Sequence, residues 1–305
     1  MLIDRLKSAI PIIVIIALCF FLPLKYGQMF FFPVAVLMLC LACHETFELL
    51  NPPRKKAFKT IAIIYGLVLV IMCGLCPIIK HWKLWHIMYL DPSILVLAML
   101  AAFCVCFKDI PKKENVNTTF AAIGATVFIP WSLSFIPKLF FASSPQFDLR
   151  PILFFMILVT KIADTGAFAA GSWTAKRPEG NHKLIPLVSP KKSWEGLIGG
   201  TVASVVTALI CYFFWPASVS VNGMKLFGLQ EVIIIGILAS VIGLLGDLAE
   251  SALKRAAGAK DSGNLPGIGG ILDTLDSLIF IAPIFYAYLN FAIANQAAQI
   301  MKFNQ

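Results

Sequence analysis

Long apolar runs separated by short polar segments recur along the 305-residue chain. Each run is about 17–25 residues long, the length that a helix needs to cross roughly 30 Å of hydrocarbon. A water-soluble fold could not bury so many such segments, and a transmembrane β-barrel would show short alternating segments instead. The pattern predicts an all-α, polytopic membrane protein with about nine transmembrane helices. We place them at 8–24, 29–49, 58–79, 91–107, 119–140, 151–171, 196–215, 231–249 and 275–295.

The first apolar run, 8–24, follows a short basic N-terminus and has two interpretations. A secretory signal peptide would begin in this way, but no clear small-x-small cleavage site comes after the run. We therefore interpret it as a retained first helix. The composition agrees with a membrane protein, because 59% of the residues are hydrophobic and only 13% are charged.

The distribution of Lys and Arg predicts the orientation of the helices. With a cytoplasmic N-terminus, the cytoplasmic segments hold most of the basic residues, as the positive-inside rule requires. These residues are Arg5, Lys7, Arg54, Lys55, Lys56, Lys59, Lys108, Lys112, Lys113, Lys176, Arg177, Lys183, Lys191, Lys192, Lys254, Arg255 and Lys260. The orientation places the polar loops 172–195 and 250–274 on the same side of the membrane, so that they can build one site. The net charge of +9 is spread over short loops and indicates no nucleic-acid partner.

The eight cysteines indicate no disulfide framework, because most lie within apolar runs, where a thiol behaves as a small hydrophobic side chain. Cys40-Leu-Ala-Cys43-His44 has the spacing of a covalent haem attachment motif. It lies at the end of an apolar helix on the predicted cytoplasmic side, and we interpret it as packed helix residues.

Residues 247–276 form a polar stretch between two apolar runs. In a helix, Asp247, Glu250, Ser251 and Lys254 would share one face, because they follow the spacing i, i+3, i+4 and i+7. Four aspartates stand beside three cations in this stretch, and a magnesium–polyphosphate site needs both carboxylates and cations. They are Asp247, Asp261, Asp273 and Asp276, with Lys254, Arg255 and Lys260.

Each of these residues also has a purely structural interpretation. Asp273 and Asp276 would complement the N-terminus of the last helix. Lys254 and Arg255 would act as topology determinants. The structural interpretations explain single residues well but explain the whole cluster poorly, so the cluster favours a phosphate and metal site.

The second polar region runs from Lys161 to Gly196. Lys161 and Asp164 are charged residues in an apolar helix, a placement that suggests function, although a snorkelling lysine with an i, i+3 partner would look the same. The loop that follows offers cations and hydrogen-bond donors suited to phosphates, although its lysine pair also satisfies the positive-inside rule. These residues are Asn181, His182, Lys183, Ser189, Lys191 and Lys192.

Together these motifs resemble the phosphatidate cytidylyltransferase (CDP-diacylglycerol synthase) family. One motif is Ser251-x-x-Lys254-Arg255-x4-Lys260-Asp261, followed by Pro266-Gly267-x-Gly269-Gly270-x-x-Asp273-x-x-Asp276. The other is His182-Lys183-Leu184-x-Pro186 with Ser189-Pro190-Lys191-Lys192-Ser193-Trp194-Glu195-Gly196, preceded by Asp164 and Gly171. The resemblance is specific over about 160–280, whereas the first five apolar runs agree only in hydrophobic character.

The resemblance implies transfer of CMP from CTP to phosphatidate, which gives CDP-diacylglycerol and pyrophosphate. It implies catalytic roles for Asp247, Asp273, Lys254 and Lys192. It implies Mg²⁺, with a second cation as a further option, on Asp247 and Asp273, supported by Asp276 and Asp261. The substrate-binding residues would be Asp164, His182, Lys183, Ser189, Lys191, Ser251, Arg255, Lys260, Gly269 and Gly270. The family also suggests a homodimer in the cell (inner) membrane, with its active site facing the cytoplasm.

The resemblance sharpens the expected domain organisation. We expect one integral membrane domain, 1–305, because no linker or convincing repeat interrupts the chain. Within it, the helices of 1–150 would be a scaffold, and those of 151–295, with loops 172–195 and 250–274, would carry catalysis.

The chain departs from the family pattern at several positions. Ile268 stands where the family usually has His, and Thr274 stands where it usually has Arg. The loop before Pro266 is one residue shorter than usual, and Ser172–Gly180 resembles a short insertion. Three alternatives remain open: a CTP-dependent transferase or kinase acting on another lipid, a secondary transporter, and an inactive scaffold.

Overall fold

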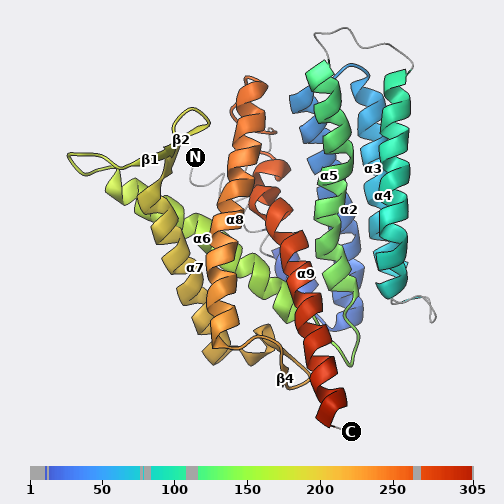
Figure 1. Cartoon of the computed structure of the whole chain (residues 1–305), viewed down its shortest axis with the longest axis vertical. Helices are drawn as coiled ribbons and strands as arrows, with labels where there is room; N and C mark the ends of the chain where they lie inside the picture. The colour runs from blue at the N-terminus through green and yellow to red at the C-terminus, as the bar shows by residue number, and fades with distance from the viewer. Residues whose placement is uncertain are drawn as a thin grey trace. The chain divides into compact units, whose positions relative to one another are not determined.

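The protein is mostly helical, as predicted (Figure 1). This computed structural model describes residues 11, 14–75, 78, 84–107, 116–263 and 269–303. The long helices are α2 (Leu24–Leu50), α3 (Lys55–Leu75), α4 (Leu84–Phe107), α5 (Val116–Phe141), α6 (Arg150–Thr174), α7 (Trp194–Phe214), α8 (Leu229–Ala256) and α9 (Ile271–Phe303).

Within the described residues, seven helices are long and apolar enough to cross a membrane, namely α2, α3 and α5 to α9. Helix α4 contains a shorter apolar segment, Leu90–Cys106, which matches the predicted span 91–107. The first predicted span, 8–24, lies partly outside the described residues, and its residues 14–21 are helical. The chain is therefore a multi-pass helical membrane protein.

The chain divides into two compact units. Unit 1 comprises Met1–Ser144 and Leu253–Leu275, and unit 2 comprises Pro145–Ala252 and Asp276–Gln305. Helices α8 and α9 each contribute residues to both units. The expectation of a single domain with a scaffold half and a catalytic half stays a prediction.

Unit 1 has a core of aromatic and aliphatic side chains between α2, α3 and α5. Phe47, Phe58 and Phe140 are fully buried, and the rings of Phe31 and Phe140 stack with their centroids 3.8 Å apart. A buried ion pair also lies in this unit. The ammonium of Lys138 on α5 lies 2.5 Å from Asp91 Oδ2 on α4 and 4.1 Å from the centroid of the Phe135 ring.

Unit 2 is built on a close contact between α6 and α7, which small residues permit. A methyl group at Gly166 would lie 2.6 Å from Ala203 Cβ, and one at Gly200 would lie 2.7 Å from the carbonyl oxygen of Ala163. A methyl group at Gly199 would overlap that of Ala170. The glycines and alanines let the two backbones approach closely, as is common between membrane helices.

Two short β-hairpins, which the sequence analysis did not predict, complete unit 2. Strands β1 (Lys183–Ile185) and β2 (Ser189–Ser193) are antiparallel, and this hairpin lies within the predicted polar loop 172–195. Strands β3 (Ser220–Val221) and β4 (Met224–Lys225) pair around an Asn222-Gly223 turn. Both turn residues have positive φ, 52° and 75°, as an Asn-Gly hairpin turn requires.

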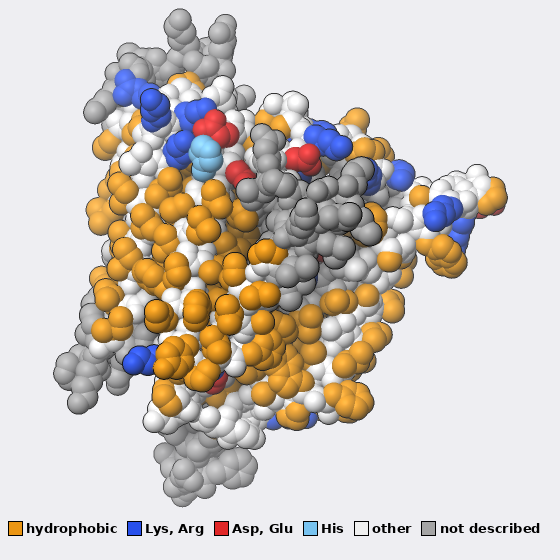
Figure 2. Space-filling model, turned by 180° about the vertical axis from the view of Figure 1, so that it is seen from behind, with side chains coloured by type: hydrophobic (Ala, Val, Ile, Leu, Met, Phe, Trp, Pro, Cys, Tyr) orange, Lys and Arg blue, Asp and Glu red, His pale blue; other side chains and the backbone are white. Residues whose placement is uncertain are grey.

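Apolar side chains on the outside of the helices fit a bilayer. On α7, Ile198, Val202, Val206 and Ile210 follow one another at intervals of four and are each about half exposed or more. Figure 2 shows hydrophobic side chains covering the sides of the helices on one face of the protein. Such an exposed apolar surface is stable in lipid and would be costly in water.

Candidate functional site

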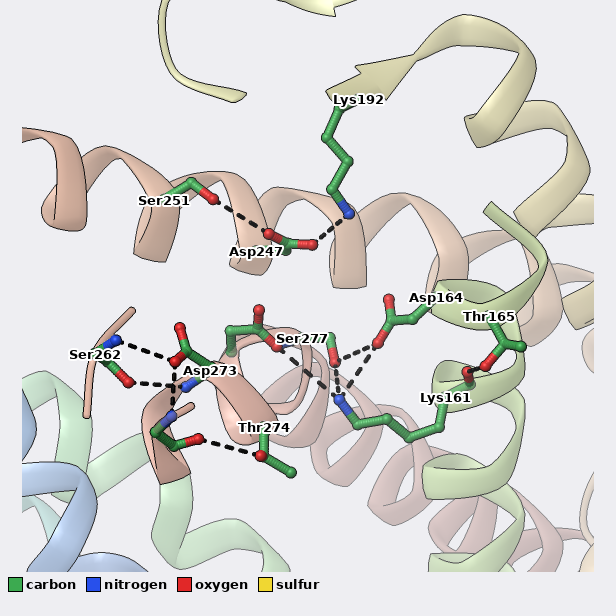
Figure 3. A network of polar contacts seen from close by, with 12 residues as sticks. Lys161, Asp164, Thr165, Lys192, Asp247, Ser251, Ser262, Asp273, Thr274 and Ser277 are labelled. Atoms are coloured by element: carbon green, nitrogen blue, oxygen red, sulfur yellow. Dashed lines mark hydrogen bonds and ion pairs between the residues drawn. The ribbon is translucent and has the colours of Figure 1, made fainter. Parts of the chain in front are cut away.

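The ammonium of Lys161 is the centre of a polar cluster in unit 2 (Figure 3). It donates to Ser277 Oγ at 2.7 Å and to Asp164 Oδ2 at 3.3 Å, and it lies 3.9 Å from Asp276 Oδ1. Ser277 Oγ donates in turn to Asp164 Oδ2 at 3.0 Å. The i, i+3 pair of Lys161 and Asp164, which the sequence offered as the structural alternative to a functional role, is present, and a contact between α6 and α9 extends it.

Glycines on α8 bring that helix close to this cluster. A methyl group at Gly246 would lie 3.2 Å from Ser277 Cα and would overlap the carbonyl oxygen of Asp276. One at Gly243 would contact the Ser277 side chain at 3.4 Å. The close approach explains why the residue before Asp247 is a glycine.

Asp247 and Lys192 form an ion pair between α8 and strand β2 (Figure 3). Ser251, one turn along α8, donates to Asp247 Oδ1 at 3.3 Å. The side chains of Lys192 and Asp247 are 24% and 23% exposed, so both remain partly open to solvent. The structure thus brings together Lys192, Asp247 and Ser251, three residues singled out from two distant motifs.

A cavity of about 520 Å³ opens beside this ion pair in unit 2. Its polar wall carries three lysines, three serines, an asparagine and a carboxylate, and its apolar wall includes Phe168, Leu197 and Leu244. The polar residues are Ser172, Asn181, Lys183, Ser189, Lys191, Lys192, Ser193 and Asp247. A concave site with convergent polar groups and an apolar side suits an amphiphilic phosphate ligand.

Local hydrogen bonds hold the β1–β2 hairpin on the ends of α6 and α7. Asn181 Nδ2 donates to the carbonyl of Gly171 at 2.9 Å. Ser193 caps α7 by accepting from the Gly196 amide at 3.1 Å. His182 Nδ1 lies 2.6 Å from Glu195 Oε1, and its backbone amide donates to the same carboxylate. His182 is therefore engaged in anchoring the hairpin, and its side chain does not line the cavity.

Asp273 organises a second polar group, in unit 1 (Figure 3). Its Oδ1 accepts from Lys254 Nζ at 2.6 Å. Its Oδ2 accepts from the backbone amides of Gly270 at 2.8 Å and Ser262 at 3.0 Å. The bond back to Gly270, the N-cap residue of α9, makes Asp273 part of a helix cap, as the structural interpretation expected. The Asp273 carboxylate also holds the Lys254 ammonium, a contact that the interpretation as a helix cap did not include.

Glu45 is a residue of this group that the sequence analysis missed. It lies on α2, is 6% exposed, and accepts from Ser262 Oγ at 2.8 Å and from the amides of Ile271 and Leu272 at 2.9 and 2.8 Å. Its signal was present, because a carboxylate within the apolar run 29–49 is costly unless it is paired.

The remaining predicted residues of the second polar loop are on the surface of unit 1. Arg255, Lys260 and Asp261 are exposed, and Gly269 has a φ of 87°, which favours glycine. Thr274, at the position where Arg is usual, donates to the carbonyl of Gly270 at 3.2 Å. Ile268 and the preceding Pro266-Gly267 lie outside the described residues.

The predicted magnesium ligands stay a prediction, because they are divided between the two units: Asp247 and Asp276 belong to unit 2, and Asp261 and Asp273 belong to unit 1. No group of three or more His, Cys, Asp or Glu side chains arranged for a metal occurs among the residues that the structure describes. The donor chemistry nevertheless suits Mg²⁺, because Asp164, Asp276 and Ser277 already surround a cation, the Lys161 ammonium, with oxygen atoms. Asp247 and Asp273 are each paired with a lysine instead.

Comparison with known proteins identifies the chain. The sequence profile of the Cytidylyltransferase family matches residues 7–292. The chain belongs to this cytidylyltransferase family. The match covers nearly the whole chain, including the apolar runs before residue 150, where motifs gave no support.

Several bacterial relatives of this cytidylyltransferase carry the name phosphatidate cytidylyltransferase. One from Staphylococcus epidermidis is 32% identical over 274 residues, 88% of this chain and 94% of the relative. One from Bacillus subtilis is 32% identical over 264 residues, 84% of this chain and 88% of the relative. The match to one from Staphylococcus saprophyticus is 41% identical over 133 residues and spans only about half of each protein, 43% and 46%.

Proposed function

We propose that this chain is a phosphatidate cytidylyltransferase, which transfers CMP from CTP to phosphatidate and releases pyrophosphate. The observation that carries the proposal is family membership over residues 7–292, together with relatives of that name that align over most of their length. The clusters of lysines and carboxylates in both polar regions support it, because phosphate chemistry needs such groups.

In the proposed reaction, a phosphate oxygen of phosphatidate attacks the α-phosphorus of CTP. A new P–O bond forms, the bond between the α-phosphorus and the bridging oxygen to the β-phosphorus breaks, and pyrophosphate leaves with the electron pair. Such a transfer needs positioning and charge neutralisation more than covalent catalysis.

We assign the residues of each unit separate parts of this work. In unit 2, the cavity lysines, Lys183, Lys191 and Lys192, would bind phosphate oxygens, and the apolar wall would accept the start of the acyl chains. In unit 1, Lys254 would bind phosphates of CTP, with Asp273 holding its ammonium in place. Arg255 and Lys260 would supply further positive charge.

Mg²⁺, when bound, would neutralise phosphate charge and polarise the α-phosphoryl group. Asp247 and Asp273 would hold it, with Asp276 and Asp261 in support, as the family resemblance implies. Asp247 contacts Lys192 and Asp273 contacts Lys254, so each carboxylate that would hold the metal has a lysine beside it that would bind a phosphate oxygen.

We also propose that the N-terminus and the catalytic loops face the cytoplasm, where CTP is found, and that the protein acts as a homodimer. The three lysines that line the cavity support the orientation, because basic residues favour the cytoplasmic side.

The test is a label-transfer assay on the purified protein with phosphatidate, Mg²⁺ and CTP labelled at the α-phosphate. We expect label in the lipid for the wild-type protein. Asp273→Asn should lower turnover on the order of 100-fold, because it loses the charge that positions Lys254 and binds metal. Glu179→Gln is the matched control, since Glu179 is exposed and has no assigned role.

Two results would contradict the proposal. An unlabelled lipid with α-labelled CTP, together with a labelled lipid in a parallel reaction with γ-labelled CTP, would identify a lipid kinase. Full turnover by a folded Asp273→Asn protein would remove Asp273 from the catalytic machinery.

A further inference from the structure

Glu45 is a buried carboxylate whose charge is balanced by a helix end. It accepts one hydroxyl and two backbone amides, from Ser262, Ile271 and Leu272. Among the described residues, no Lys or Arg forms an ion pair with it. The positive end of α9 therefore supplies its counter-charge, an arrangement that stabilises both the helix and the carboxylate.

Two glycines make room for this carboxylate. A methyl group at Gly263 would lie 2.9 Å from Glu45 Cδ. One at Gly270 would lie 2.7 Å from the Gly263 amide nitrogen and would overlap Ser262 Oγ and Glu45 Oε2. The backbone on both sides of Glu45 is thus packed directly against its oxygens, and a larger residue at either position would displace it.

Glu45 and Asp273 together occupy the first amides of α9. The Gly270 amide donates to Asp273, those of Ile271 and Leu272 donate to Glu45, and that of Asp273 donates to Ser262 Oγ at 3.3 Å. A free helix N-terminus is a common phosphate-binding site. Here its amides are already used by the protein, so phosphates must be bound by side-chain cations such as Lys254.

We propose that Glu45 is a positioning residue for the CTP-binding group of unit 1. By holding the Ser262 hydroxyl and the first turn of α9, it fixes the frame in which Asp273 orients the Lys254 ammonium. The inference rests on the proposed function for the identity of the nucleotide. The placement of the amides by Glu45 is independent of that function.

Glu45→Gln removes the charge while keeping the size of the side chain. We expect amide hydrogen exchange in residues 269–275 to accelerate about tenfold or more, because hydrogen bonds to a charged acceptor are replaced by weaker ones. The KM for CTP should rise about tenfold, and the KM for phosphatidate should stay unchanged. A loss of folded protein alone would lower turnover without changing either KM.

Glu48→Gln is the matched control, one turn along the same helix. Glu48 is 43% exposed and pairs with Lys55 and Lys59, so its loss should change neither exchange in 269–275 nor the KM for CTP. Should Glu45→Gln fail to fold, Ser262→Ala removes the hydroxyl that donates to Glu45 and accepts from the Asp273 amide, and it should shift both quantities in the same direction by a smaller factor.

Wild-type exchange rates in 269–275 for a folded Glu45→Gln protein would overturn the inference. Faster exchange with an unchanged KM for CTP would also overturn it, since Glu45 would then be only a helix cap. If the wild-type protein transfers no label from CTP, the proposed function fails, and the exchange rates still decide whether Glu45 holds the amides.

Discussion

Replacing Lys161 by methionine tests whether its ammonium holds the polar cluster of unit 2 together. The change keeps an unbranched side chain, one atom shorter, but removes the cation from between Asp164, Ser277 and Asp276, at 3.3, 2.7 and 3.9 Å. The two carboxylates are then left near each other without their shared partner.

The contacts set the size of the effect. Breaking a fully buried pair costs about 3–5 kcal/mol, because one charge stays unpaired. Here the side chains of Lys161 and Asp164 are 34% and 33% exposed, so water compensates in part, whereas Asp276 is only 10% exposed. We therefore expect a destabilisation of about 2 kcal/mol, within the range for a hydrogen-bonded charge.

Thermal unfolding in detergent, followed by size-exclusion chromatography, measures the effect. Lys161→Met should lower the Tm, and adding Asp164→Asn should restore much of the loss, because one unpaired charge is removed. Lys176→Met is the control, since Lys176 is exposed and should matter by less than about 0.5 kcal/mol. Equal Tm values for Lys161→Met and Lys176→Met would refute the reasoning.

Two further predictions concern unit 1. Gly270→Ala should destabilise the protein by about 1–3 kcal/mol, because the added methyl group overlaps Ser262 Oγ. Gly124→Ala is the control and should have almost no effect, since nothing lies within 4 Å of the added atom. Equal Tm values for both variants would contradict this prediction. Lys138→Met should lower the free energy of unfolding by about 3–5 kcal/mol, because Asp91 stays buried without its cation. The double variant Lys138→Met with Asp91→Asn should recover most of the Tm, because no buried charge is left unpaired. A double variant no more stable than the single one would contradict this prediction.

Much of the helical fold could be predicted from the apolar pattern. The predicted span 151–171 lies within α6, Arg150–Thr174, and 119–140 lies within α5, Val116–Phe141. The length of an apolar run is enough to predict a helix, because the backbone amides of a segment in a bilayer must form their hydrogen bonds within that segment. The β1–β2 hairpin was missed because its strands, Lys-Leu-Ile and Ser-Pro-Lys-Lys-Ser, are short and mostly polar, so no alternation of apolar and polar residues marks them in the sequence.

The candidate site could be predicted only in part. The pairing of Lys161 with Asp164 was offered by helical spacing as the structural alternative to a functional role. The pairing of Lys192 with Asp247 joins residues far apart in the chain, and no local pattern specifies such a contact. Glu45 was missed because its partners are mostly backbone amides, which any sequence would supply. The metal ligands and the union of both polar loops in one site remain predictions.

If the proposed substrate is accepted, the contact between α6 and α7 decides which parts of the protein adjust to lipids of different size. Gly199, Gly200 and Gly166 leave no side-chain volume between these helices, so neither can slide along the other without a collision of backbones. The β1–β2 hairpin, anchored at both ends on this pair, therefore has a fixed base, while Leu187 near its turn is 93% exposed. Tolerance toward substrates of unequal bulk must come from the hairpin turn and from cavity side chains such as Phe168, and these are the positions at which to engineer it.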